Sequence, residues 1–214
     1  MNIHILQSKE WEHLSQKGMS SEEVYTTIRA ATEEATPLLP PLSPYVNISV
    51  YPTREGLIKE TGDMGFTYDE ERIEILFDPT LPYGVEKHKE HLRATTFHEL
   101  NHTARSLVIP YDPSPLSDMV SEGTATVFER DFANGSPLWG LYEDEATMRQ
   151  WLKEIKALPT NEKNYEYLFD HPDGRRWIIY KTGTWVIDHL IKSEQATLNE
   201  LTLMPVEQVI DLIA

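Results

Sequence analysis

The sequence predicts an α+β protein in the order of one helix, a small sheet, and then helices only. Residues 46–50 alternate apolar and polar side chains, and residues 65–68 and 72–77 flank Asp69-Glu70-Glu71 as the two strands of a hairpin. From residue 86 onward, apolar side chains recur every three or four positions, which is typical of helices. Strands and helices are therefore segregated along the chain, as in α+β architectures.

Capping residues and prolines set the limits of the segments around the sheet. Ser20 and Glu23 form a capping box, so a helix is predicted from residue 21 to the proline-rich residues 37–41, which cannot continue it. A shorter helix is predicted at residues 54–61, before the hairpin. On the second hairpin strand, the side chains expected to face the core are Ile73, Ile75 and Phe77.

The second half of the chain is predicted to be helical. Ser117 is the expected N-cap of one helix, and Asn134-Gly135 is its expected left-handed end. The predicted helices cover residues 86–108, 117–133, 144–158, 161–170, 175–192 and a short segment after Pro205. We expect a single domain over residues 1–214, with an upper lobe at about 1–108 and a lower helical lobe at about 109–214.

Composition argues against several classes of protein. The 214 residues include 19 basic and 35 acidic ones, a net charge of −16 that disfavours binding to nucleic acid or to an anionic membrane. There is no cysteine, so a metal site must use histidine and carboxylate. The first residues lack the pattern of a signal peptide, and no apolar run approaches the length of a membrane span. We expect a cytoplasmic protein, and the oligomeric state stays open.

One motif indicates a metal site: His98-Glu99-Leu100-Asn101-His102 reads H-E-x-x-H. On a helix, positions i and i+4 lie about 40° apart on one face, so two imidazoles placed there can hold one zinc ion. The intervening carboxylate can then act as the general base for a metal-activated water. The opposite side of the helix, expected to be buried, carries Phe97, Leu100, Ala104, Leu107 and Val108.

A catalytic zinc site needs a third protein ligand. Glu122 is the main candidate, because the 19 residues between it and His102 allow a loop and one helical turn. Gly123 is small enough to let this second helix approach the first closely. Asp118 and Glu129 lie on the same stripe of the second helix and are alternatives, either as ligands or as acceptors for an imidazole N–H.

These motifs resemble those of the gluzincin metallopeptidases, the group that includes thermolysin. The longer pattern is similar to a bacterial family of predicted zinc-dependent proteases: His98-Glu99-x-x-His102-x-x-Arg105, then Glu122-Gly123, then Tyr180-x-x-Gly183. The resemblance covers residues 97–183. The sequence departs from it at Thr126, where thermolysin-like enzymes carry an aspartate, and at Thr103, where many family members have histidine.

The resemblance implies a mainly helical zincin-like fold, with the sheet beside the active-site helix, and zinc-dependent hydrolysis of peptide or protein substrates. It also implies that an edge strand pairs with extended substrate, and residues 73–77 are the candidate strand. Two alternatives stay open: a catalytically silent binding or regulatory protein on a peptidase fold, and a zinc hydrolase of a non-peptide amide.

Further polar residues have expected roles around this site. Tyr180 is the candidate donor to the oxyanion, and Tyr165 and His171 are its rivals. Arg105 is expected to pair with a carboxylate of the second helix. The remaining histidines of the predicted helix at 86–108, His88 and His91, are expected to be exposed, with a place lining the cleft as the alternative for His91.

Overall fold

The first half of the chain builds one four-stranded sheet in the order β1-β2-β4-β3. Its strands are β1 (Asn2–Ile5), β2 (Asn47–Pro52), β3 (Asp63–Asp69) and β4 (Arg72–Phe77). β2 runs parallel to both β1 and β4, whereas β3 runs antiparallel to β4 and forms one edge of the sheet. The alternation that predicted β2 and the hairpin is confirmed, because Ile48, Val50 and the predicted set Ile73, Ile75 and Phe77 are fully buried.

The structure is a computed structural model that describes residues 1–110, 112–159 and 164–213. It divides into two units, one made of Met1–Leu107 with Phe132–Gly135, the other of Val108–Asp131 with Ser136–Ala214. The prediction of a single domain with two lobes stays a prediction. The part of the chain that the structure describes holds no helix long and apolar enough to cross a membrane.

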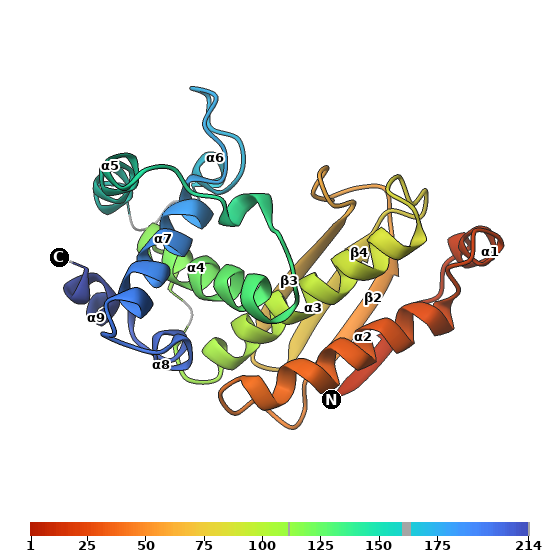
Figure 1. Ribbon diagram of the computed structural model, residues 1–214. Helices are drawn as coiled ribbons and strands as arrows, with labels where there is room; N and C mark the ends of the chain where they lie inside the picture. Colours follow the sequence, from red (N-terminus) through yellow and green to blue (C-terminus); the bar gives the residue numbers. More distant parts are fainter. Residues whose placement is uncertain (111, 160–163, 214) are drawn as a thin grey trace. The chain divides into compact units, whose positions relative to one another are not determined.

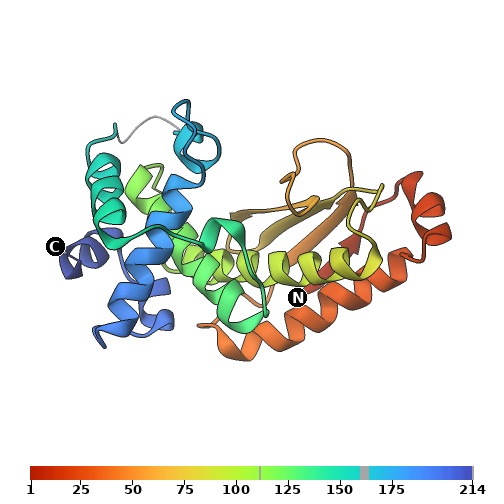
Figure 2. The ribbon, with the colours of Figure 1, turned by 45° about the horizontal axis from the view of Figure 1, so that its top comes forward.

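Two helices cover one face of the sheet in the first unit. α2 (Ser21–Ala35) and α3 (Val85–Ser106) lie side by side across it, and α1 (Glu10–Gln16) and the short η1 (Thr36–Leu38) flank α2 (Figures 1 and 2). The predicted capping box is present, with the Ser20 hydroxyl accepting from the backbone N–H of Glu23. Phe97, Leu100 and Ala104 are buried as predicted, but Leu107 and Val108, beyond the end of α3, are 41% and 54% exposed.

The second unit is helical, as predicted. Its elements are α4 (Pro115–Phe132), η2 (Leu138–Gly140), α5 (Glu145–Lys156), α6 (Tyr165–Leu168), α7 (Ile178–Lys192), α8 (Leu198–Thr202) and α9 (Val206–Leu212). Apolar side chains of α4, α5 and α7 form its core, among them Val120, Trp151 and Val186. Arg130 of α4 donates to both carboxylate oxygens of the buried Asp188 of α7, at 2.9 Å each, which ties these two helices together.

Several boundaries differ from the prediction, each for a local reason. Residues 54–61 form bends and turns instead of a helix, and the Ile58 N–H donates to the Asp63 carbonyl as an isolated bridge. α4 begins at Pro115, because Ser114 and not Ser117 is the capping residue: the Ser114 hydroxyl accepts from the backbone N–H of Ser117 at 3.2 Å. α7 begins at Ile178, because Trp177 has a positive φ of 60° and its N–H donates to the Phe169 carbonyl.

Three further segments bear on the predictions. β1 was not predicted, because its four residues show only a short, half-exposed alternation. Asn134 has a φ of 54°, which confirms the left-handed end of α4. Of the helix predicted at 161–170, residues 161–163 lie outside the described residues, and the remainder includes α6.

The small residue Gly123 serves a contact that was not predicted. A Cβ added to Gly123 would lie 2.5 Å from the carbonyl carbon of Gly183, and one added to Gly183 would lie 2.0 Å from the Met119 carbonyl oxygen. The close approach at Gly123 is therefore between α4 and α7. The predicted approach of α4 to the H-E-x-x-H helix at Gly123 stays a prediction.

This contact generates a stability prediction. Gly183→Ala should lower the free energy of unfolding by about 3 kcal/mol or more, because the new methyl group meets backbone atoms that cannot rotate away. Gly174→Ala is the control: its added Cβ meets nothing within 4 Å, and it bears only the strain of a φ of +91°, about 1–2 kcal/mol. Denaturant unfolding measures both, and equal losses in the two variants would contradict the close packing of α4 and α7.

Candidate metal centre

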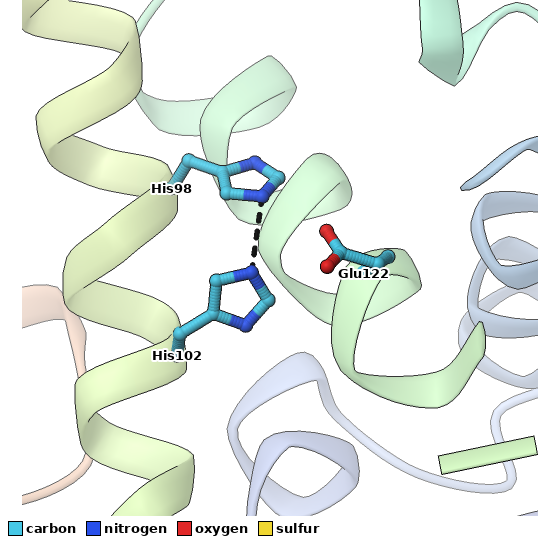
Figure 3. A group of neighbouring side chains, drawn as sticks. All are labelled: His98, His102 and Glu122. Atoms are coloured by element: carbon cyan, nitrogen blue, oxygen red, sulfur yellow. Dashed lines mark hydrogen bonds between the residues drawn. The ribbon is translucent and has the colours of Figure 1, made fainter. Parts of the chain in front are cut away.

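Two imidazoles project from consecutive turns of α3. His98 and His102 are four residues apart, so the helix places them on one face. Their Nε2 atoms lie 3.1 Å apart, and the ring planes meet edge to face at 74° (Figure 3). His98 is buried and His102 is half-buried. The two rings thus present one nitrogen each to a common point.

A carboxylate completes this group. Glu122 of α4 is half-buried, and its carboxylate oxygens are turned towards the two rings (Figure 3). One ligand atom each from His98, His102 and Glu122 lies within 4.8 Å of the others. The structure therefore brings together the three residues that the sequence predicted as ligands.

The chemistry and spacing of this group fit zinc. Zinc accepts imidazole nitrogen and carboxylate oxygen, and catalytic sites use three protein ligands with one position left for water or substrate. With Zn–N bonds of about 2.0–2.1 Å in a tetrahedron, two ligating nitrogens lie about 3.3 Å apart. The 3.1 Å separation of the two Nε2 atoms is close to that value.

The carboxylate of Glu99 lies on the side of α3 that faces β3. Glu99 is buried, and its Oε2 accepts a hydrogen bond of 2.7 Å from the hydroxyl of Thr67. Gly65, two residues earlier on β3, lies directly against the same carboxylate. Neither β3 residue was assigned a role from the sequence; the one available signal was a glycine inside a predicted strand, which marks a close approach.

A comparison with protein families decides which family the chain is part of. A model described as "Predicted Zn-dependent protease (DUF2268)" matches residues 25–211, which is most of the chain. The chain belongs to this family. Comparison with curated proteins and with solved structures gives no match.

Family and geometry point to the same cofactor. The family is described as zinc-dependent, and the structure holds a cluster of His98, His102 and Glu122 that can bind a metal ion. Zinc is therefore the cofactor, and a protease of this family would act on peptide substrates.

Other residues predicted for the site lie on the same elements, and their roles stay predictions. On α4, Glu129 is buried and Asp118 is half-buried. On α3, Arg105 is buried, and burial lowers the pKa of its guanidinium to about 10, so it stays charged at neutral pH. Its predicted partner on the second helix is not tested by these observations.

The oxyanion candidate Tyr180 begins α7 among aromatic rings. It is half-buried, with the ring centroids of Trp177 and Trp139 at 5.6 and 6.3 Å. Of its two rivals, Tyr165 is exposed, and His171 has its Nδ1 2.8 Å from a carboxylate oxygen of Asp173.

Two predictions around this helix are wrong. His88 is fully buried: its Nδ1 lies 3.0 Å from the Gly84 carbonyl oxygen, its ring stacks on Tyr83, and burial lowers its pKa. The predicted exposure of His88 failed because the sequence does not show that residues 62 and 83 pack over this turn.

The strand at 73–77, which was predicted to pair with substrate at an edge of the sheet, is not an edge strand, because β4 lies between β2 and β3.

Proposed function

We propose that the chain is a gluzincin-type zinc metallopeptidase with a zincin-like fold, which hydrolyses peptide bonds in peptide or protein substrates. The observation that carries the proposal is the cluster of two imidazoles and one carboxylate on α3 and α4, with Glu99 between the two histidines in the sequence of α3. The family match supports the same class of reaction.

In this proposal His98, His102 and Glu122 hold the zinc ion. Zinc supplies a Lewis acid that lowers the pKa of water to about 7 and polarises a carbonyl group. Asp118, Glu129 and Arg105 are proposed to orient the ligands through hydrogen bonds from outside the first coordination sphere, because such contacts set the direction of imidazole and carboxylate ligands.

Glu99 is proposed to be the general base. Its carboxylate takes a proton from water as the water attacks the peptide carbonyl, and then passes the proton to the leaving nitrogen. On α3, Glu99 lies about 100° from His98 around the helix axis, which allows it to flank the ion without ligating it. Tyr180 is proposed to donate a hydrogen bond to the developing oxyanion.

The edge strand of the first unit supports extended peptide as the substrate class. Among the described strands, β3 lies at the end of the sheet and pairs with β4 on one side, so its other edge can take a further strand. Such pairing supplies main-chain hydrogen bonds with little demand on side chains. We propose β3 for this role.

The ligand assignment predicts how zinc affinity responds to substitution. Glu122→Ala should weaken zinc binding by orders of magnitude, because ligand number and type set the affinity. Glu145→Ala, which removes an exposed carboxylate of α5, should bind zinc like the parent. Titration against a competing chelator measures both. Parent-like affinity of Glu122→Ala, with loss in Asp118→Ala or Glu129→Ala, would show that another carboxylate is the ligand.

The general base is tested by Glu99→Gln, which keeps the shape of the side chain but accepts no proton. Zinc content should be unchanged, and hydrolysis of a broad peptide library should fall by about 10²–10⁴-fold. Glu90→Gln, an exposed site on the same helix, is the matched control and should keep parent activity.

Three outcomes would contradict the proposal in different ways. Equal activity of Glu99→Gln and parent would remove Glu99 from the mechanism. A zinc-loaded parent that cleaves no peptide or protein would favour the silent binding protein. Cleavage of small amides without cleavage of peptides would favour the non-peptide hydrolase.

A further inference from the structure

The Glu99 carboxylate contacts the edge strand β3, although Glu99 itself belongs to α3. Side chains of a strand alternate between its two faces, and on β3 Phe66 and Tyr68 are exposed while Gly65 and Thr67 face the helix side with Ile75 and Ile73 of β4. Gly65 and Thr67 are thus the two β3 residues placed against Glu99.

Gly65 leaves the space that the carboxylate fills. A Cβ added to Gly65 would lie 2.3 Å from Oε1, 2.5 Å from Cγ and 2.6 Å from Cδ of Glu99. Real side chains do not approach that closely, so no residue with a Cβ fits there unless Glu99 moves. Gly65 has an ordinary backbone conformation, so contact with Glu99, and not a positive φ, accounts for glycine at this position.

Thr67 holds the other side of the carboxylate. Its hydroxyl is 2.7 Å from Oε2 and 3.1 Å from the backbone carbonyl oxygen of Glu99. Both of these oxygens are acceptors, and the hydroxyl has one proton, so they share it in a bifurcated hydrogen bond in which Oε2 is the nearer acceptor. This bond fixes the position of the helix along the strand at Glu99. The Thr103 hydroxyl, one turn later on α3, also donates to the Glu99 carbonyl oxygen at 2.9 Å.

We infer that Gly65 and Thr67 are positioning residues for the general base: Gly65 provides the space and Thr67 the hydrogen bond that hold the Glu99 carboxylate in one place. The functional part of this inference rests on the proposed function of Glu99. Because β3 is also the edge strand, the same strand that we propose to pair with substrate fixes the base.

The space at Gly65 is tested by a stability cycle that needs neither activity nor zinc. In the full chain with metal removed by a chelator, Gly65→Ala should lower the equilibrium constant for folding about tenfold more in the parent than in Glu99→Ala, where the three contacting atoms are gone. Glu99→Gln is the matched control: it keeps the shape of the side chain, so the loss should remain.

Two results of this cycle would overturn the steric role of Gly65. Equal losses in the parent and in Glu99→Ala would overturn the steric role of Gly65. If Gly65→Ala alone does not fold, the double variant with Glu99→Ala should fold, and its failure to do so would equally overturn that role.

The hydrogen bond is tested by Thr67→Val and Thr67→Ser in the zinc-loaded chain. Valine has the shape of threonine and favours strands, but it lacks the hydroxyl, whereas serine keeps it. Thr67→Val should lower kcat about tenfold or more, with KM within about twofold and zinc affinity unchanged, and Thr67→Ser should restore most of kcat. A residue that only supported the strand would give the opposite order, with Val at least as active as Ser.

Failure of this inference is separable from failure of the proposed function. If the parent is active and Glu99→Gln is not, while Thr67→Val keeps parent kcat, then the role of Thr67 is overturned and Glu99 remains the base. If the parent is inactive, the proposed function fails. The stability cycle at Gly65 then still decides whether the Glu99 carboxylate lies against Gly65.

Discussion

The packing of α3 against the sheet is the constraint on which the rest of the site depends. Phe97, Leu100 and Ala104 are fully buried, and they fix the rotation of the helix about its own axis. A helix advances about 100° per residue, so this rotation also fixes where the side chains of positions 98, 99 and 102 point. The directions of His98, Glu99 and His102 therefore depend on the buried apolar side chains elsewhere around the same helix.

In each unit, glycines allow a close contact beside a residue of the proposed site. In the first unit, Gly65 of β3 lets the Glu99 carboxylate lie directly against the strand. In the second, Gly123 and Gly183 let α4 and α7 approach each other at the residue that follows Glu122. The ion pair of the half-buried Arg130 with the buried Asp188 joins the same two helices, two turns after Gly123 and just over one turn after Gly183. Burial alone would raise the pKa of the Asp188 carboxyl, but the hydrogen bonds from Arg130 and Tyr142 outweigh it and hold the pKa below its usual value.

Much of this arrangement could be predicted because its signals are local. The capping box at Ser20, the alternation of Ile73, Ile75 and Phe77, and the i, i+4 histidines all depend on residues within one element. The structure confirms the elements that these signals predicted, and it brings Glu122 to the histidines as expected.

The predictions that failed depended on contacts between distant segments. His88 is buried because residues from other turns cover it, and periodicity within α3 does not contain that information. The interior position of β4 follows from the parallel pairing with β2, more than 20 residues earlier in the chain. The contact of Gly123 with Gly183 was not predicted, because Gly183 is 60 residues away, on α7. Thr67 and Gly65 likewise acquire a possible role only once β3 is placed beside Glu99.

In the proposed metal centre, one zinc ion is held by His98, His102 and Glu122. The most direct measurement is an anomalous difference map from crystals of the zinc-loaded full chain, with data collected on both sides of the zinc absorption edge. We expect one strong peak within about 2.0–2.2 Å of an imidazole nitrogen of each histidine and of a carboxylate oxygen of Glu122. A peak bonded to a different set of residues, or no peak in crystals whose protein contains stoichiometric zinc at another place, would contradict the account.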